Sequence, residues 1–99
     1  MVTTYPEFFA YCRHLHGEVL HTGARGRPFT VSVVGDALHF TPASGKGRRA
    51  DPERTERVLR QLAESNEWSP GAYQAITYHA SYILAIAKHR SENEGRAAV

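Results

Sequence analysis

Alternating apolar and polar residues on both sides of Gly35 and Asp36 predict a β-hairpin over residues 29–41. A two-residue loop that begins with glycine suits the tight turns between antiparallel strands. This loop places Val31 opposite Phe40 and separates the residues into two faces. The apolar face consists of Phe29, Val31, Val33, Leu38 and Phe40, and the polar face of Thr30, Ser32, His39 and Thr41. Because a slip of one residue would mix the faces, the pattern favours a single register, and the apolar face needs a cover.

Helical spacing of apolar residues predicts a first helix over residues 5–16. Thr4 and Glu7 stand three positions apart at its start, which is the spacing of a capping box. Gly17 is a typical residue just past a helix C-terminus. The predicted buried stripe includes Cys12.

Two further helices are predicted after the hairpin. Asp51 is the expected N-cap of the second helix, which ends near residue 65 or 66. Ser69 is the expected N-cap of the third, which continues to about residue 90. The third helix has the most apolar surface, so we expect it to cover the apolar face of the hairpin.

These elements predict an α+β fold in the order α-β-β-β-α-α, with a short additional strand over residues 18–22. The small antiparallel sheet, with the hairpin 29–41 at its centre, would pack against the three helices. Residues 1–90 would form one globular domain, since a chain of 99 residues suits a single core. Residues 91–99 have few apolar side chains and are expected to form a flexible tail.

Composition and apolar run lengths indicate where in the cell the protein is expected. The longest apolar run near the C-terminus, residues 83–87, is too short to cross a bilayer, so no membrane association is expected. No basic segment precedes an apolar stretch at the N-terminus, so no signal peptide is expected. The single Cys12 cannot form a disulfide within the chain. A cytoplasmic location is therefore the expectation.

Positive charge is concentrated in the middle of the chain. Residues 23–60 hold eight basic and four acidic side chains, whereas each flank carries a small negative charge. Strand pairing in the hairpin brings the loop before it and the glycine-containing loop after it to the same end. Five cations should meet there: Arg25, Arg27, Lys46, Arg48 and Arg49. Such a cluster suits a phosphate backbone, although charged loops are often only solvated surface.

Other chemistry finds little support. The Gly45-Lys46 pair is not a P-loop, because Phe40 and Gly47 occupy positions where glycine and a hydroxyl residue are required. Cys12 and His16 lie one helical turn apart, but no second pair of ligands accompanies them, so no metal and no cofactor are expected. No acid–base pair converges in the sequence, and we expect no enzymatic activity.

The leading interpretation is a small, non-enzymatic nucleic-acid-binding module that contacts phosphates through its basic loop, with DNA favoured over RNA. The alternative is a protein-interaction module, an inhibitor or adaptor, that presents the third helix or the basic loop to an acidic partner. Tyr78 and Tyr82, one helical turn apart, would form part of such a surface, and the third helix could also support a homodimer. The segments RPFTV, GDALHFTP and ASYILAI together resemble small accessory domains of bacterial or phage restriction and mobile-element proteins. The resemblance assigns no functional residue.

Overall fold

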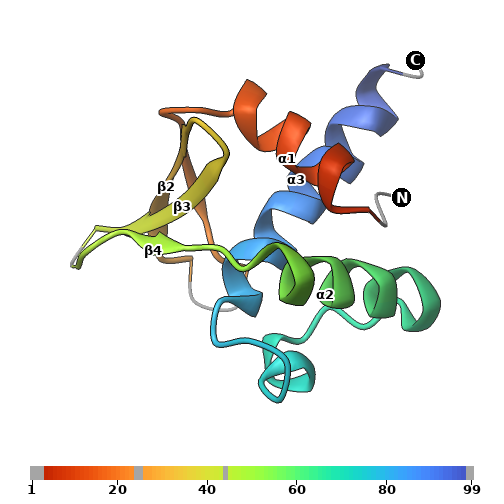
Figure 1. Ribbon diagram of the computed structural model, residues 1–99. Coiled ribbons are helices and arrows are strands. Elements are labelled where there is room, and N and C mark those ends of the chain that lie inside the picture. Colours follow the sequence, from red (N-terminus) through yellow and green to blue (C-terminus); the bar gives the residue numbers. More distant parts are fainter. Residues whose placement is uncertain (1–3, 24–25, 44, 98–99) are drawn as a thin grey trace.

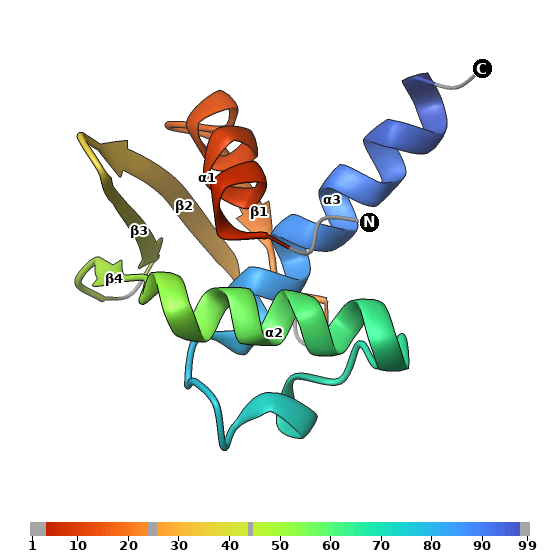
Figure 2. The ribbon, with the colours of Figure 1, turned by 45° about the vertical axis from the view of Figure 1, so that its right-hand side comes forward.

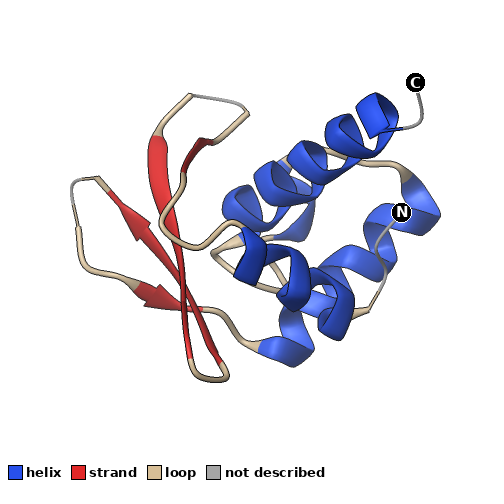
Figure 3. Cartoon of the chain, turned by 90° about the horizontal axis from the view of Figure 1, so that it is seen from above, coloured by secondary structure: helices blue, strands red, loops and turns tan. Residues whose placement is uncertain are grey.

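The computed structural model describes residues 4–23, 26–43 and 45–97. Within these residues it contains three α-helices, one short 3-10 helix and a four-stranded antiparallel sheet (Figure 1). The helices gather on one side of the sheet and leave its other face open (Figures 2 and 3). This arrangement confirms the α+β fold. None of the described helices is both long and apolar enough to cross a membrane.

The hairpin has the predicted register. β2 (Pro28–Val34) and β3 (Ala37–Pro42) pair with Val31 opposite Phe40, and Gly35 adopts a φ of 59° in the turn between them. A positive φ is easily reached by glycine, which explains its place at the turn. On the inner face, all five predicted residues are buried except Val33, which is partly buried. The alternation of apolar and polar residues is therefore sufficient to predict this part of the fold.

Two short strands extend the hairpin on both sides, in the order β1-β2-β3-β4. The expected β1 (Val19–His21) pairs with β2. β4 (Arg48–Arg49) pairs with β3, whereas the sequence predicts that these residues belong to the basic loop. The main-chain N–H of Ala50 donates to Leu38 at 2.8 Å and continues the ladder beyond β4. The predicted order therefore needs one correction, to α-β-β-β-β-α-α.

α1 (Tyr5–His14) begins without the predicted capping box. The side chain of Thr4 caps no N–H group. Instead, the N–H of Tyr5 donates to Oε1 of Glu56 at 2.9 Å, so a carboxylate of another helix takes the place of the local cap. That helix, α2 (Pro52–Ser65), begins and ends as predicted. Asp51 accepts a hydrogen bond from the N–H of Arg54 at 3.0 Å, and residue 66 ends the helix in the left-handed conformation.

The predicted third helix is wrong over its first turns. Residues 70–73 form a 3-10 helix, η1 (Pro70–Tyr73), a turn follows, and α3 (Ala80–Ala97) begins ten residues later than Pro70. Ser69 makes no side-chain cap. Tyr73 is fully buried, with its hydroxyl bonded to the main chain of Glu67, and this contact fixes η1 against the preceding linker. α3 also continues through most of residues 91–99, and the flexibility expected there stays a prediction.

The first turns of α3 cover the hairpin, as expected. The ring of Tyr82 lies 4.8 Å from that of Phe29 and 5.5 Å from that of Phe40, measured between ring centroids. Phe29 and Phe40 are themselves in edge contact. This aromatic cluster joins the sheet to α3 at the centre of the core. Three apolar side chains of α3 are buried inside the domain, Ile83, Leu84 and Ile86, and the homodimer stays a prediction.

Candidate nucleic-acid interface

The loops before and after the hairpin lie at the same end of the sheet, as the sequence predicts. Ala43 donates a main-chain hydrogen bond to Pro28, which links the end of β3 to the start of β2. Arg27 directly precedes β2, and its N–H donates to Oγ1 of Thr22 at 3.1 Å. Arg27 is exposed. Arg25, the other predicted cation of this loop, lies outside the described residues.

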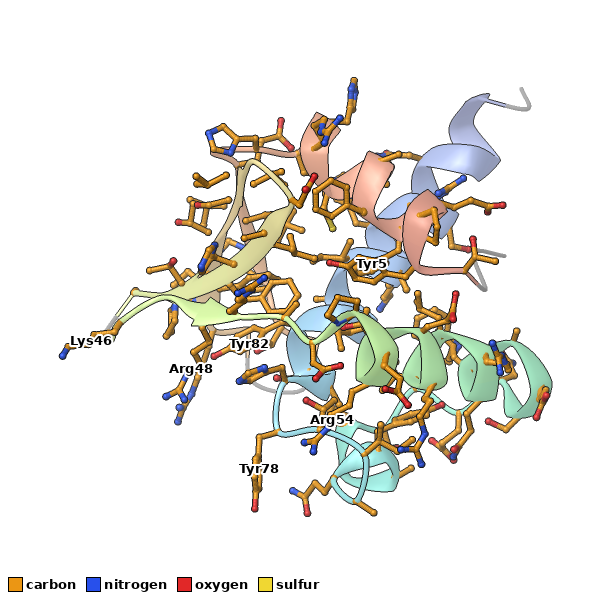
Figure 4. The ribbon with its side chains drawn as sticks, in the orientation of Figure 1. Tyr5, Lys46, Arg48, Arg54, Tyr78 and Tyr82 are labelled. Atoms are coloured by element: carbon orange, nitrogen blue, oxygen red, sulfur yellow. The ribbon has the colours of Figure 1, made fainter. Side chains whose placement is uncertain are left out.

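Lys46 lies at the tip of the β3–β4 loop, at the end of the molecule away from the helices (Figure 4). The loop closes tightly. A Cβ atom at Gly47 would lie 3.0 Å from Oγ1 of Thr41, so the close approach of the two strands favours glycine there. The N–H of Gly45 donates to the carbonyl of Pro42 at 3.3 Å. These contacts hold the loop back on β3 and leave Lys46 exposed.

Arg48 and Arg49 are adjacent in β4, and their side chains lie on opposite faces of the sheet. Successive side chains of a strand point to opposite faces of the sheet. Arg48 pairs with Phe40, whose side chain is on the helix-covered face, and Arg49 pairs with His39 on the open face. Arg48 and Arg49 therefore lie on opposite faces of the sheet, and the meeting of all five cations on one surface stays a prediction. Arg27 and Lys46 share one end of the sheet, whereas Arg48 and Arg49 continue this positive surface onto its two faces.

The described cations of this region have no acidic partner. Away from this region, Arg60 and Glu56 form an ion pair at 3.5 Å on α2. No described carboxylate comes within 4.0 Å of the charged groups of Arg27, Lys46, Arg48 or Arg49. All four residues are exposed. Their charges are therefore available to an anionic partner and are not neutralised within the fold.

Arg48 also borders a group of rings before and in α3. His79 is half-buried, and its ring lies 6.4 Å from that of Phe40 and 6.3 Å from that of Tyr82. Burial lowers the pKa of His79 below its ordinary value, and the positive charge of Arg48 lowers it further. Tyr78 precedes His79 and is 90% exposed.

Tyr78 and Tyr82 do not share a surface, contrary to the sequence prediction. Tyr82 packs on the hairpin, whereas Tyr78 lies in the turn before α3 and points outward. Arg48, Arg54 and Tyr78 project from the same side of the molecule, below β4 and α2 in the view of Figure 4. Sequence reasoning missed Arg54 as a candidate, and it considered Tyr78 only as part of a protein-interaction surface. An uninterrupted third helix would have joined Tyr78 to Tyr82, and no signal in the sequence indicates the turn.

The open face of the sheet is polar, and its described strands carry no Phe, Tyr or Trp there. Its central positions are half-buried: Thr30, Ser32, His39 and Thr41. Val19 and Val34 at its margins are 56% and 66% exposed. The face therefore offers hydrogen-bonding groups, one positive charge from Arg49 and the imidazole rings of His21 and His39, but no larger aromatic ring.

The cysteine and histidine pair does not form a reactive site. Cys12 is fully buried, and burial raises the pKa of its thiol to about 12, so it remains protonated. His16 is exposed, and its Nδ1 accepts a hydrogen bond from the N–H of Val33 at 2.9 Å. Among the residues that the structure describes, no three His, Cys, Asp or Glu side chains gather to hold a metal ion.

A cleft of about 680 Å³ lies on the opposite margin of the sheet, between β1, residues 68–70 and α3. Its apolar lining includes Leu20, Trp68 and Leu84, and its rim includes Lys88 and Glu92. Comparison with known proteins adds no assignment to either region, since no family model, curated protein or solved structure matches the chain. The function is therefore argued from the geometry of these surfaces.

Proposed function

We propose that this protein is a non-enzymatic nucleic-acid-binding domain, with DNA favoured over RNA. Arg27, Lys46 and Arg48 contact phosphates, and Arg49 extends the same surface. Arg25, which lies outside the described residues, stays a sequence-based candidate for a further contact. The observation that carries the proposal is that the described cations at this end of the sheet are exposed and have no described carboxylate within 4.0 Å. Unpaired Lys and Arg side chains gain most from contact with a phosphate backbone, because binding releases the counterions condensed on it.

The proposal makes a quantitative statement about salt. Each neutralised phosphate of duplex DNA contributes a slope of about −0.9 to the logarithm of affinity against the logarithm of salt concentration. Four phosphate contacts would give a slope of about −3 to −4. Fluorescence anisotropy with labelled duplex and single-stranded oligonucleotides, from low to physiological salt, measures this slope.

The test compares two double variants of equal charge. Lys46→Ala with Arg48→Ala should weaken binding to all sequences similarly and make the salt slope shallower by about 2. Arg13→Ala with Lys88→Ala removes two positive charges from α1 and α3, away from the β3–β4 loop, and should leave the slope unchanged. The proposal is wrong if the wild-type protein fails to bind at low salt, or if both double variants weaken binding to the same extent.

The second candidate is a protein-interaction domain, and the cleft beside β1 favours it. β1 is an edge strand, and the cleft beside it has both apolar and polar lining residues, which suits an extended peptide. A partner bound there should stay bound at high salt, because apolar contacts are not screened. Trp68→Ala should then abolish the complex, whereas the Lys46→Ala, Arg48→Ala variant should leave it intact.

A further inference from the structure

The turn before α3 holds its main chain firmly on both sides of one exposed ring. Thr77 is 8% exposed, and its N–H donates to the carbonyl of Tyr73 at 3.0 Å. Its Oγ1 accepts a hydrogen bond from the N–H of His79 at 3.2 Å. His79 in turn packs against the ring of Phe40. Tyr78, between these two held residues, is 90% exposed.

This exposure is unusual among the described aromatic residues. The other large apolar side chains that the structure shows as exposed are two valines, Val19 and Val34, at the margins of the sheet. Tyrosine has few rotatable bonds, so a tyrosine on a fixed turn loses little entropy when it binds. The turn therefore presents a pre-positioned aromatic ring to solvent.

Cations lie on the same side as this ring. Arg48 is close enough to His79, the neighbour of Tyr78, to influence the ionisation of its imidazole. Arg54, in the first turn of α2, projects from that side as well (Figure 4). Neither Arg48 nor Arg54 has a described carboxylate within 4.0 Å of its guanidinium. An aromatic ring flanked by unpaired cations is the combination that single-stranded nucleic-acid sites use, with the ring against a base and the cations on the backbone.

We propose that Tyr78 stacks on an unpaired base of a single-stranded nucleic acid, while Arg48 and Arg54 hold the adjoining phosphates. The inference rests on the proposed nucleic-acid-binding function and adds the strandedness of the ligand. Within a duplex the faces of the bases are covered by their neighbours, so a ring such as Tyr78 finds no partner there. The open face of the sheet carries no Phe, Tyr or Trp, and its only rings among the described strand residues are the smaller imidazoles of His21 and His39.

The first experiment measures the affinity of the full chain for labelled oligo-dT, oligo-U and a duplex of the same length at low salt. Tyr78→Ala should weaken binding to the single strands by about 5- to 150-fold, the range seen when one base–aromatic contact is removed. Tyr78→Phe keeps the ring and should bind within about twofold of the wild type. Val34→Ala removes an exposed apolar side chain at the far end of the hairpin and should have no effect. The two single strands distinguish DNA from RNA as the source.

The second experiment alters the ligand and leaves the protein unchanged. Abasic sites remove bases but keep the phosphates, so they separate stacking from charge. On a fully abasic strand, Tyr78→Ala and the wild-type protein should bind equally, whereas Lys46→Ala with Arg48→Ala should still weaken binding. Thermal unfolding monitored by circular dichroism confirms that each variant is folded. Because Tyr78 is exposed, its substitution should leave the melting temperature unchanged.

The outcomes separate this inference from the proposed function. If Tyr78→Ala binds single strands as the wild type does, while the Lys46, Arg48 double variant binds less, the stacking role is wrong and the phosphate-binding function stands. If Tyr78→Ala weakens duplex and single-strand binding equally, the preference for single strands is wrong. If the wild-type protein binds no nucleic acid at low salt, both proposals fall together.

Discussion

The phenol hydroxyl of Tyr73 donates a hydrogen bond to the main-chain carbonyl oxygen of Glu67 at 2.6 Å. Because Tyr73 is fully buried, removal of this donor leaves the carbonyl with one partner fewer in a poorly solvated place. We expect Tyr73→Phe to lower the free energy of unfolding by about 0.5–1.5 kcal/mol. Urea denaturation measures the change. Tyr78→Phe, which removes the hydroxyl of an exposed tyrosine, is the control, and equal stability of both variants would contradict the prediction.

Removal of the Tyr5 hydroxyl should change the free energy of unfolding in the opposite direction. Among the described residues, the hydroxyl oxygen of Tyr5 is buried and lacks a hydrogen-bond partner, and burial raises the pKa of Tyr5. An unsatisfied buried hydroxyl loses its hydration without gaining a bond. Tyr5→Phe should therefore raise the free energy of unfolding by about 1 kcal/mol, measured by the same urea experiment. The main-chain bond from Tyr5 to Glu56 does not involve the hydroxyl and remains. A loss of stability would show that the hydroxyl has a partner.

Local patterns were enough to predict the hairpin and its register, because both depend on alternation and on the turn at Gly35. β4 could not be predicted in this way. Arginine has no strong preference for strands, and Arg48 and Arg49 pair with β3 because that edge of the hairpin is open. The break in the third helix has a similar cause. The apolar spacing is compatible with a continuous helix, but the buried position of Tyr73 and its bond to Glu67 fix another path.

The candidate interface also combines features that follow from local sequence patterns with features that depend on tertiary contacts. The shared end of the loops before and after the hairpin, which carry Arg27 and Lys46, follows from the hairpin alone, so the sequence predicts this arrangement of the loops correctly. The separation of Arg48 from Arg49 depends on β4, and the exposure of Tyr78 depends on the turn before α3. Both are consequences of elements that the sequence did not reveal. The sequence therefore indicates part of the charged surface, whereas it pairs Tyr78 with Tyr82 and does not indicate the separate position from which we propose that Tyr78 stacks.

Asp51 and Thr4 precede two helices, and their substitution by alanine should affect stability to different extents. The carboxylate of Asp51 caps the N–H of Arg54, whereas the side chain of Thr4 caps nothing. Asp51→Ala should lower the free energy of unfolding by about 1 kcal/mol, and Thr4→Ala by no more than a few tenths. Chemical denaturation of the two variants side by side measures the difference. A large loss for Thr4→Ala would mean that the capping box forms in solution.

His79 should make stability depend on pH. Its folded-state pKa lies below the ordinary value of 6.5, mainly through burial and also through Arg48. The native state therefore favours the neutral ring, and the unfolded state binds the proton more readily. It follows that the free energy of unfolding is unaffected above the unfolded pKa and falls as the pH drops from about 6.5 through the lowered folded value. His79→Gln removes this titration, so its stability relative to the wild type should improve as the solution is acidified.

Substitution of Arg48 tests the smaller of the two causes of the lowered His79 pKa, the positive charge of Arg48. In Arg48→Ala the pKa of His79 should move up toward its ordinary value without reaching it, because the ring stays half-buried. Nuclear magnetic resonance titration of the His79 ring protons measures this change. Arg13→Ala, which removes a cation from α1, should leave the same titration unchanged. If Arg48→Ala had no effect on His79, Arg48 would lie too far from the turn to share a ligand with Tyr78, and the two phosphate contacts proposed beside that ring would reduce to the one from Arg54.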